Sequence, residues 1–190
     1  MAVQIGIVDR AGLTLLDTYV KPHKPIPAGA TQVHGITDEM VATAPTILEL
    51  ESEIFMALHG RAVLIYNAEY DARILRQSFL YSGAREYGDP YRLPINHFVH
   101  IDTFKCVMEW FAQFYGDWND YRQNYKWQKL SIAALVLGVQ ISNAHSAIGD
   151  ALMTLGVVSG MAEARLSGEP AQPSFASLDP DTSGDYYRRG

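Results

Sequence analysis

The chain has 190 residues, of which 48% are hydrophobic, and it carries a formal net charge of −6. These values predict one globular domain with its own core, and the charge argues against broad electrostatic wrapping of duplex nucleic acid. No apolar run approaches the roughly 20 residues of a membrane span, and the N-terminus lacks the layout of a signal peptide, so we expect a cytoplasmic protein without membrane contacts. The single cysteine excludes a disulfide framework and a thiolate zinc site, so oxygen or imidazole must hold any metal.

The first 36 residues predict a β-hairpin followed by an irregular segment. Residues 3–8 and 13–20 are rich in β-branched and aromatic side chains, and turn residues separate them at 9–12. Three prolines between positions 22 and 27 predict an extended, irregular path that ends at residues 33–36.

Two helix starts and a strand follow. Thr37 is placed to begin a short helix, and Thr46 with Glu49 has the form of a capping box that opens a longer one. The buried stripe of the longer helix is predicted to be Ile47, Leu50, Ile54 and Leu58. Residues 62–66 are a short apolar run, typical of a strand that is covered on both faces.

A helix with an aspartate in its first turn is predicted directly after this strand. Asn67 is a favourable N-cap, and the helical pattern continues to Phe79. Asp71 therefore lies where unpaired N–H groups and the helix dipole stabilise a carboxylate.

The next part of the chain predicts a loop at 82–97, a fourth strand at 98–101 that ends at Asp102, and two helices. The first helix, which includes Cys106, is indicated by a stripe of apolar residues: Phe104, Val107, Met108 and Phe111. The second covers 130–137 and is closed by Gly138.

The segment 110–127 holds eight aromatic residues and allows two interpretations. Helical spacing favours core packing for its beginning. From Trp118 to Trp127 the aromatic residues are mixed with Arg122 and Lys126, a combination that could stack unpaired bases.

A histidine and a second aspartate open the last predicted helix. Five helical positions turn the side-chain direction by about 140°, so His145 and Asp150 can face one site only if His145 precedes the helix. Ser146 is then the N-cap, and Asp150 lies in the first turn, as Asp71 does in its own helix. The predicted buried stripe is Ile148, Ala151, Leu152, Leu155, Val158 and Ala162. Taken alone, this motif also fits a surface histidine beside an ordinary first-turn aspartate.

Three segments together resemble the DnaQ-like DEDD family of 3′-to-5′ exonucleases, in its histidine subclass. They are Val33–Thr37, Tyr66–Asp71 and His145–Ala151, in the order and separation of that family. The resemblance implies a ribonuclease H-like mixed β-sheet flanked by helices, with an exonuclease-like domain over residues 1–165. We expect residues 166–190, rich in Gly, Pro, Ser and Asp, to form a flexible or disordered tail.

The resemblance also implies a two-metal nuclease that binds Mg²⁺ or Mn²⁺ and acts on the 3′ end of single-stranded DNA or RNA. By this likeness Asp71 and Asp150 would be metal ligands, and His145 the general base that takes a proton from the attacking water. The expected substrate-binding residues are His34, Gly35, Ile36 and Asn67.

The chain departs from the family at its first motif, a central strand that carries Asp-x-Glu. Only three residues precede Gln4, and none is acidic, so two of the four expected ligands are missing from the sequence given. We expect either that Met1 is an internal methionine of a longer product, or that a partner strand, from another molecule or a second copy of the chain, completes the sheet.

Three functions remain open at this point. The chain is an exonuclease, or a catalytically inactive exonuclease-like fold that binds nucleic acid or protein, or a structural α/β domain whose His and Asp residues are incidental. The sequence decides neither between DNA and RNA nor the oligomeric state.

Overall fold

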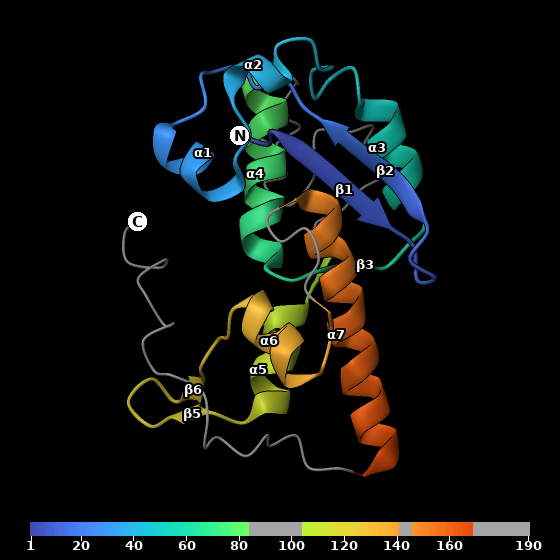
Figure 1. The fold of residues 1–190 in the computed structure, drawn as a ribbon, viewed down its shortest axis with the longest axis vertical. Helices are drawn as coiled ribbons and strands as arrows, with labels where there is room; N and C mark the ends of the chain where they lie inside the picture. Colours follow the sequence, from blue (N-terminus) through green and yellow to red (C-terminus); the bar gives the residue numbers. More distant parts are fainter. Residues whose placement is uncertain (84–103, 141–145, 169–190) are drawn as a thin grey trace.

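The computed structural model describes residues 1–83, 104–140 and 146–168. In the N-terminal half the elements are β1 (Gln4–Val8), β2 (Thr14–Tyr19), α1 (Ala28–His34), α2 (Asp38–Val41), α3 (Glu51–Leu58), β3 (Val63–Ile65) and α4 (Ala68–Tyr81). In the C-terminal half they are β4 (Phe104–Cys106), α5 (Val107–Tyr115), β5 (Trp118–Asn119), β6 (Asn124–Tyr125), α6 (Leu130–Val136) and α7 (Ala147–Ser167). Small sheets flanked by helices confirm the mixed α/β class (Figure 1).

The predicted hairpin is confirmed. β1 and β2 pair antiparallel from Gln4↔Tyr19 to Val8↔Thr14, with an irregularity between Ile7 and Val8. The carboxylate of Asp9 accepts hydrogen bonds from two backbone N–H groups of the turn, which fixes its shape.

The irregular path predicted for residues 21–36 is wrong in part, because α1 occupies its second half. Pro27 precedes the first helical residue with extended backbone angles, and its carbonyl accepts hydrogen bonds from the N–H groups of Ala30 and Thr31. A proline just before a helix removes no intrahelical hydrogen bond, so the prolines open this helix instead of preventing it. Gly35, at φ 72°, ends it.

The predicted helix start at Thr37 is confirmed, but the one at Thr46 is wrong, because residues 47–50 form turns and α3 begins at Glu51 with Leu50 as its N-cap. Thr37 accepts a hydrogen bond from the N–H of Met40 and caps α2. Thr46 N–H donates to Glu49 Oε2 over 2.7 Å, and Glu49 N–H donates to Thr46 Oγ1 over 3.4 Å, the reciprocal pair of a capping box. The residues predicted to be buried are Ile47, Leu50, Ile54 and Leu58, and all four are 7% exposed or less.

The boundary between strand and helix near residue 106 differs from the prediction. Phe104 and Cys106, which we expected in a helix, belong to β4 and pair in parallel with Val63 and Ile65 of β3. This pairing satisfies backbone groups that a helix would have satisfied locally, so the helix begins at Val107. β3 is also less covered than expected, since Leu64 is 38% exposed. The strand predicted at 98–101 and Asp102 lie outside the described residues.

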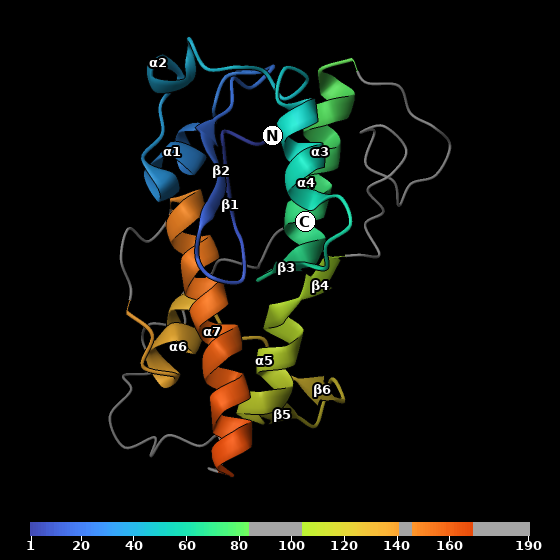
Figure 2. The same cartoon turned by 90° about the vertical axis from the view of Figure 1, so that its right-hand side faces the viewer.

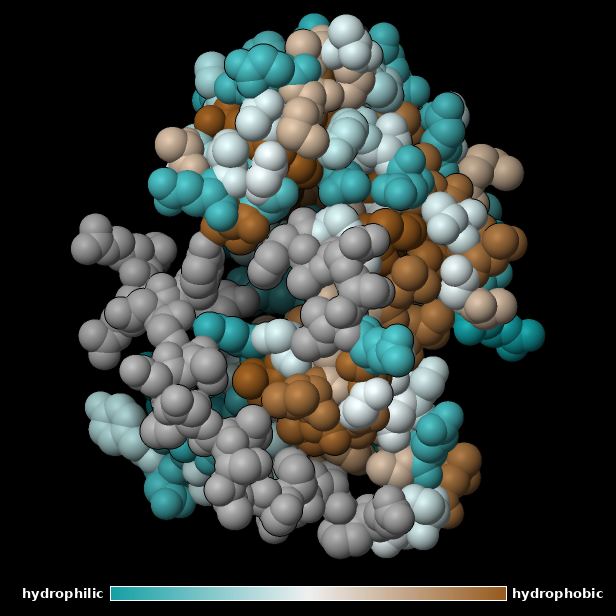
Figure 3. Space-filling view, viewed as in Figure 1, coloured by the Kyte–Doolittle hydropathy of each residue, from teal (hydrophilic) through white to brown (hydrophobic). Residues whose placement is uncertain are grey.

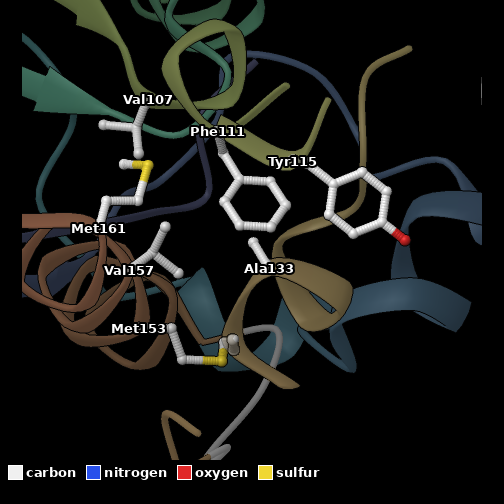
Figure 4. Close-up of a cluster of buried hydrophobic side chains, with 8 residues drawn as sticks. Val107, Phe111, Tyr115, Ala133, Met153, Val157 and Met161 are labelled. Carbon is white, nitrogen blue, oxygen red and sulfur yellow. The ribbon is translucent and has the colours of Figure 1, made fainter. Parts of the chain in front are cut away.

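Two apolar clusters hold these elements together. In the first, Ile5 and Ile7 of β1 and Val63 of β3 pack against Val20, which follows β2, and against residues of α3, α4 and the turn before α3, so the two separate two-stranded sheets share one core. In the second, α5, α6 and α7 meet (Figure 2). Figure 4 shows the side chains of α7 in that cluster pointing toward Phe111 of α5 and Ala133 of α6.

The face that α7 buries differs from the predicted stripe. Its buried residues are Gly149, Met153, Thr154, Val157 and Met161, whereas Leu152 is 41% exposed and Ala162 is exposed. Apolar side chains surround most of this helix, some of them at the surface (Figure 3), so periodicity alone does not select a face, and contact with α5 and α6 does.

Helix α7 is 21 residues long and, by length and composition only, apolar enough to cross a membrane. A helix in the core of a protein passes the same test, and α7 packs against β1, α5 and α6. It ends at Ser167, two residues after the predicted domain boundary, and residues 169–190 lie outside the described residues.

Candidate active site

Asp71 lies in the first turn of α4, at a helix start that is fixed by local contacts. Asn67 is the N-cap, and its side-chain oxygen accepts a hydrogen bond from the N–H of Tyr70 over 3.4 Å. The N–H of Asp71 donates to the carbonyl of Asn67 over 3.1 Å. One residue earlier, the carbonyl of Tyr66 accepts a hydrogen bond from the N–H of Met108 over 2.8 Å, which ties this start to α5.

Asp150 lies in the first turn of α7, which is fixed by local and distant contacts. The side chain of Ser146 accepts a hydrogen bond from the N–H of Gly149 over 3.1 Å and confirms the predicted N-cap. The N–H of Ala147 donates to Oε1 of Gln4 over 3.1 Å, across 143 positions of the chain. The first helical N–H groups lack partners within their own helix, so this contact from β1 satisfies one of them.

Gly6 allows β1 to approach α7 closely. A Cβ atom at this position would lie 2.8 Å from the carbonyl oxygen of Ala147 and would clash with the backbone nitrogen of Ile148. Any side chain at position 6 would therefore push the start of α7, which carries Asp150, away from the hairpin.

The two aspartates lie near enough to each other for the charge of Asp150 to act on Asp71. The pKa of Asp71 is raised from 3.8 to about 6, first because surrounding protein atoms displace water from the carboxylate, and second because of the negative charge of Asp150. The side chain of Asp71 is nevertheless exposed at the surface, so neighbouring protein atoms displace only part of its water.

This pair of carboxylates suits a divalent cation. Oxygen donors are the ligands that Mg²⁺ and Mn²⁺ prefer, and a cation would replace the repulsion between the two carboxylates with attraction. No group of three or more His, Cys, Asp or Glu residues that could hold a metal occurs within residues 1–83, 104–140 and 146–168. Asp71 and Asp150 are therefore the candidate ligand pair of the described residues.

Comparison with known proteins decides the family. The model of the exonuclease family RNase_T matches residues 4–158. The uncharacterized exonuclease CP81 of Escherichia phage 186 is 38% identical over 162 residues, which cover 85% of this chain and 79% of the phage protein.

The chain belongs to the exonuclease family. It is therefore a DnaQ-like member of the ribonuclease H-like superfamily, as its three motifs predict, and this family consists of nucleases of the hydrolase class that act on nucleic acid. Members of this family generally use divalent metal ions.

Two further relatives of this exonuclease are DNA polymerase III epsilon subunits. That of Buchnera aphidicola is 25% identical over 137 residues, which cover 72% of this chain and 50% of the subunit. That of Treponema pallidum is 28% identical over 152 residues, which cover 78% of this chain and 62% of the subunit. The exonuclease thus spans about half to three-fifths of these subunits.

The structure does not test the roles predicted for the other site residues of the exonuclease. His145 lies outside the described residues. His34 ends α1, its Nδ1 accepts a hydrogen bond from the N–H of Ile36 over 3.0 Å, and partial burial lowers its pKa. Gly35 is the C-cap of α1. Ile36 is 4% exposed, so its side chain packs in the interior. The substrate-binding roles of these residues and of Asn67 stay predictions.

The sequence patterns did not indicate that Gln4 and Gly6 help to position the start of α7, which carries Asp150. Gly6 carries a signal that could have identified it, since a glycine inside a strand often marks the close approach of another backbone. Gln4 carries none, because its contact with Ala147 depends on how β1 and α7 meet.

Proposed function

We propose that this exonuclease removes nucleotides from the 3′ end of single-stranded DNA or RNA, with Asp71 and Asp150 as ligands of a two-ion Mg²⁺ or Mn²⁺ site. The observation that carries the proposal is the pair of carboxylates at two helix starts, where the charge of Asp150 contributes to raising the pKa of Asp71. When bound, the cations supply an activated water for attack on phosphorus and stabilise the leaving 3′ oxygen.

The chain's own residues hold the cations and accept a proton in this reaction. Asp71 must be ionised to act as a ligand, so in the metal-free protein, where its pKa is raised to about 6, a proton competes with the cation as the pH falls toward that value. His145 directly precedes the N-cap of α7, and as general base its imidazole accepts the proton of the attacking water.

A nuclease assay tests this function. Single-stranded DNA and RNA, labelled at the 5′ end, are incubated with the protein and Mn²⁺, and the products are sized. Progressive shortening that is lost in Asp150→Ala supports the proposal. Glu53→Ala is the matched control, because Glu53 is an exposed acidic residue in the first turn of α3. Shortening that persists unchanged in Asp150→Ala, or release of the labelled 5′ nucleotide first, contradicts it.

A second function, an inactive fold that binds nucleic acid or protein, is favoured by one observation. Only two carboxylates converge in the part of the chain that the structure describes, and a two-ion site needs more ligands. Metal-independent binding of single strands without shortening in the same assay supports this alternative.

The proposal includes a further strand that completes the sheet. Within the described ranges β1 pairs with β2 and β3 pairs with β4, although both pairs contribute to one core. A strand from a second copy of the chain or from another protein could join them. Light scattering after gel filtration tests the first source: a dimer supports it, and an active monomer contradicts it.

A further inference from the structure

Four large aromatic side chains lie at the surface on and beside the β5–β6 hairpin. Trp118 is 44% exposed, Tyr121 95%, Tyr125 37% and Trp127 56%. Figures 1 and 2 show this hairpin next to α5, in the part of the molecule away from β1 and β2. Clustered exposed rings of this kind mark an interaction site more often than isolated ones do.

The hairpin that carries these rings is held in one shape. The side chain of Asn119 accepts hydrogen bonds from the N–H groups of Tyr121 and Arg122, each over 3.0 Å. The rings of Trp118 and Tyr125 meet edge to face with centroids 5.0 Å apart. A surface fixed in this way loses little conformational entropy when a ligand binds.

Cationic side chains lie beside these rings. Residues 117–129 carry Arg122, Lys126 and Lys129 against Asp117 and Asp120, a net charge of +1 in a chain whose net charge is −6. Lys126 pairs with Asp117 over 2.9 Å and remains half exposed. Cations beside exposed aromatic rings suit a ligand that has both phosphates and unpaired planar bases.

The hairpin is connected to the candidate active site. The hydroxyl of Tyr66 donates a hydrogen bond to the carbonyl of Gln128, next to Trp127, over 2.8 Å. Tyr66 immediately precedes Asn67, the N-cap of the helix that carries Asp71. The segment that follows the hairpin therefore contacts the residue directly before the start of α4.

We infer that Tyr121 and Trp127 form a stacking platform for unpaired bases of a single strand whose 3′ end lies at the Asp71–Asp150 site. Arg122 contacts the phosphates of that strand. This inference rests on the proposed function for the location of the 3′ end. Duplex ends are poor ligands for the platform, because their bases already stack on one another.

Binding of fluorescein-labelled dT20 in EDTA, followed by anisotropy, tests the platform without any catalytic step. Tyr121→Ala and Trp127→Ala are each expected to weaken binding roughly fivefold to 100-fold, whereas Tyr121→Phe and Trp127→Phe retain a ring and bind nearly as well as the parent. Tyr19→Ala is the control, since Tyr19 is 37% exposed on β2, in another part of the fold. Arg122→Glu is expected to weaken binding and to reduce its salt dependence, and Arg122→Lys to preserve both.

The outcomes separate the platform from the nuclease proposal. Ring-dependent binding in a chain that shortens no strand supports the platform and contradicts the nuclease. Unchanged dT20 binding in both alanine variants overturns the platform, even where shortening proceeds, and indicates that the rings serve a protein partner. Equal affinity for dT20 and for a blunt duplex also overturns it.

Discussion

The starts of α4 and α7 share a design but differ in what holds them. Both place an aspartate in the first turn behind a side-chain N-cap, Asn67 in one and Ser146 in the other. α4 follows directly from β3, whose parallel partner β4 leads into α5, whereas α7 depends on β1 from the other end of the chain. The first carboxylate site is therefore held by contacts within residues 63–108, and packing against the N-terminal strand must bring the second one to it.

The largest expected effect comes from removing either carboxylate. Asp71→Asn and Asp150→Asn should each reduce metal-dependent shortening of a single strand by roughly 100-fold or more, because each removes a proposed metal ligand. Initial rates across a Mn²⁺ titration measure this. If one variant retains the parental rate at every Mn²⁺ concentration, the two helix starts do not share a site.

The next largest effect is expected from the close contact between Gly6 of β1 and the start of α7. Gly6→Ala should destabilise the protein by about 1–3 kcal/mol, because the added methyl group meets the backbone of Ala147 and Ile148. Gly29→Ala is the matched control: a Cβ there meets nothing within 4 Å, and alanine favours a helix. Thermal unfolding of both variants measures the difference, and equal melting temperatures would contradict the close approach.

The caps give a smaller effect that compares the two starts directly. Asn67→Ala and Ser146→Ala should each cost about 1 kcal/mol of unfolding free energy. Gln4→Ala should cost about as much as Ser146→Ala, since Gln4 also accepts from an N–H of the first turn of α7. Urea unfolding measures all three. A Gln4→Ala variant as stable as the parent would mean that β1 does not cap α7.

The smallest effect concerns pH. The folded pKa of Asp71, about 6, exceeds its ordinary value of 3.8, so the folded state binds this proton more tightly and the metal-free protein loses stability as pH rises from about 4 through 6. Because Asp71 is accessible to water, we expect about 1 kcal/mol of loss at most. Asp71→Asn should abolish this loss and raise the melting temperature at pH 8 by roughly 2–4 °C. A lower melting temperature for this variant in EDTA would oppose the account.

The sequence predicted features whose causes are local. The caps at Asn67 and Ser146 depend on residues three positions apart, and both form as predicted. The hydrogen bonds of the Thr46–Glu49 capping box also form, but the helix begins only at Glu51. The hairpin β1–β2 belongs to the same class, because its turn lies between its strands.

The errors arise where distant segments decide. Residues 104–106 fit a helical stripe, but β3 offers them a parallel partner. The buried face of α7 is selected by α5 and α6, not by its own pattern. The proximity of Asp71 and Asp150 followed from the family resemblance rather than from any periodicity, and the sequence contains no local sign that Gln4 contacts Ala147.

Calorimetric titration of the protein with Mn²⁺ tests most directly whether the two helix starts form one metal site. The parent, Asp71→Asn, Asp150→Asn and the double variant are compared at pH 7.5, with Glu53→Ala as control. If the site is shared, each single substitution weakens Mn²⁺ binding about tenfold or more, and their effects are not additive in the double variant. Parental affinity in either single variant, or independent additive losses, would contradict a shared site.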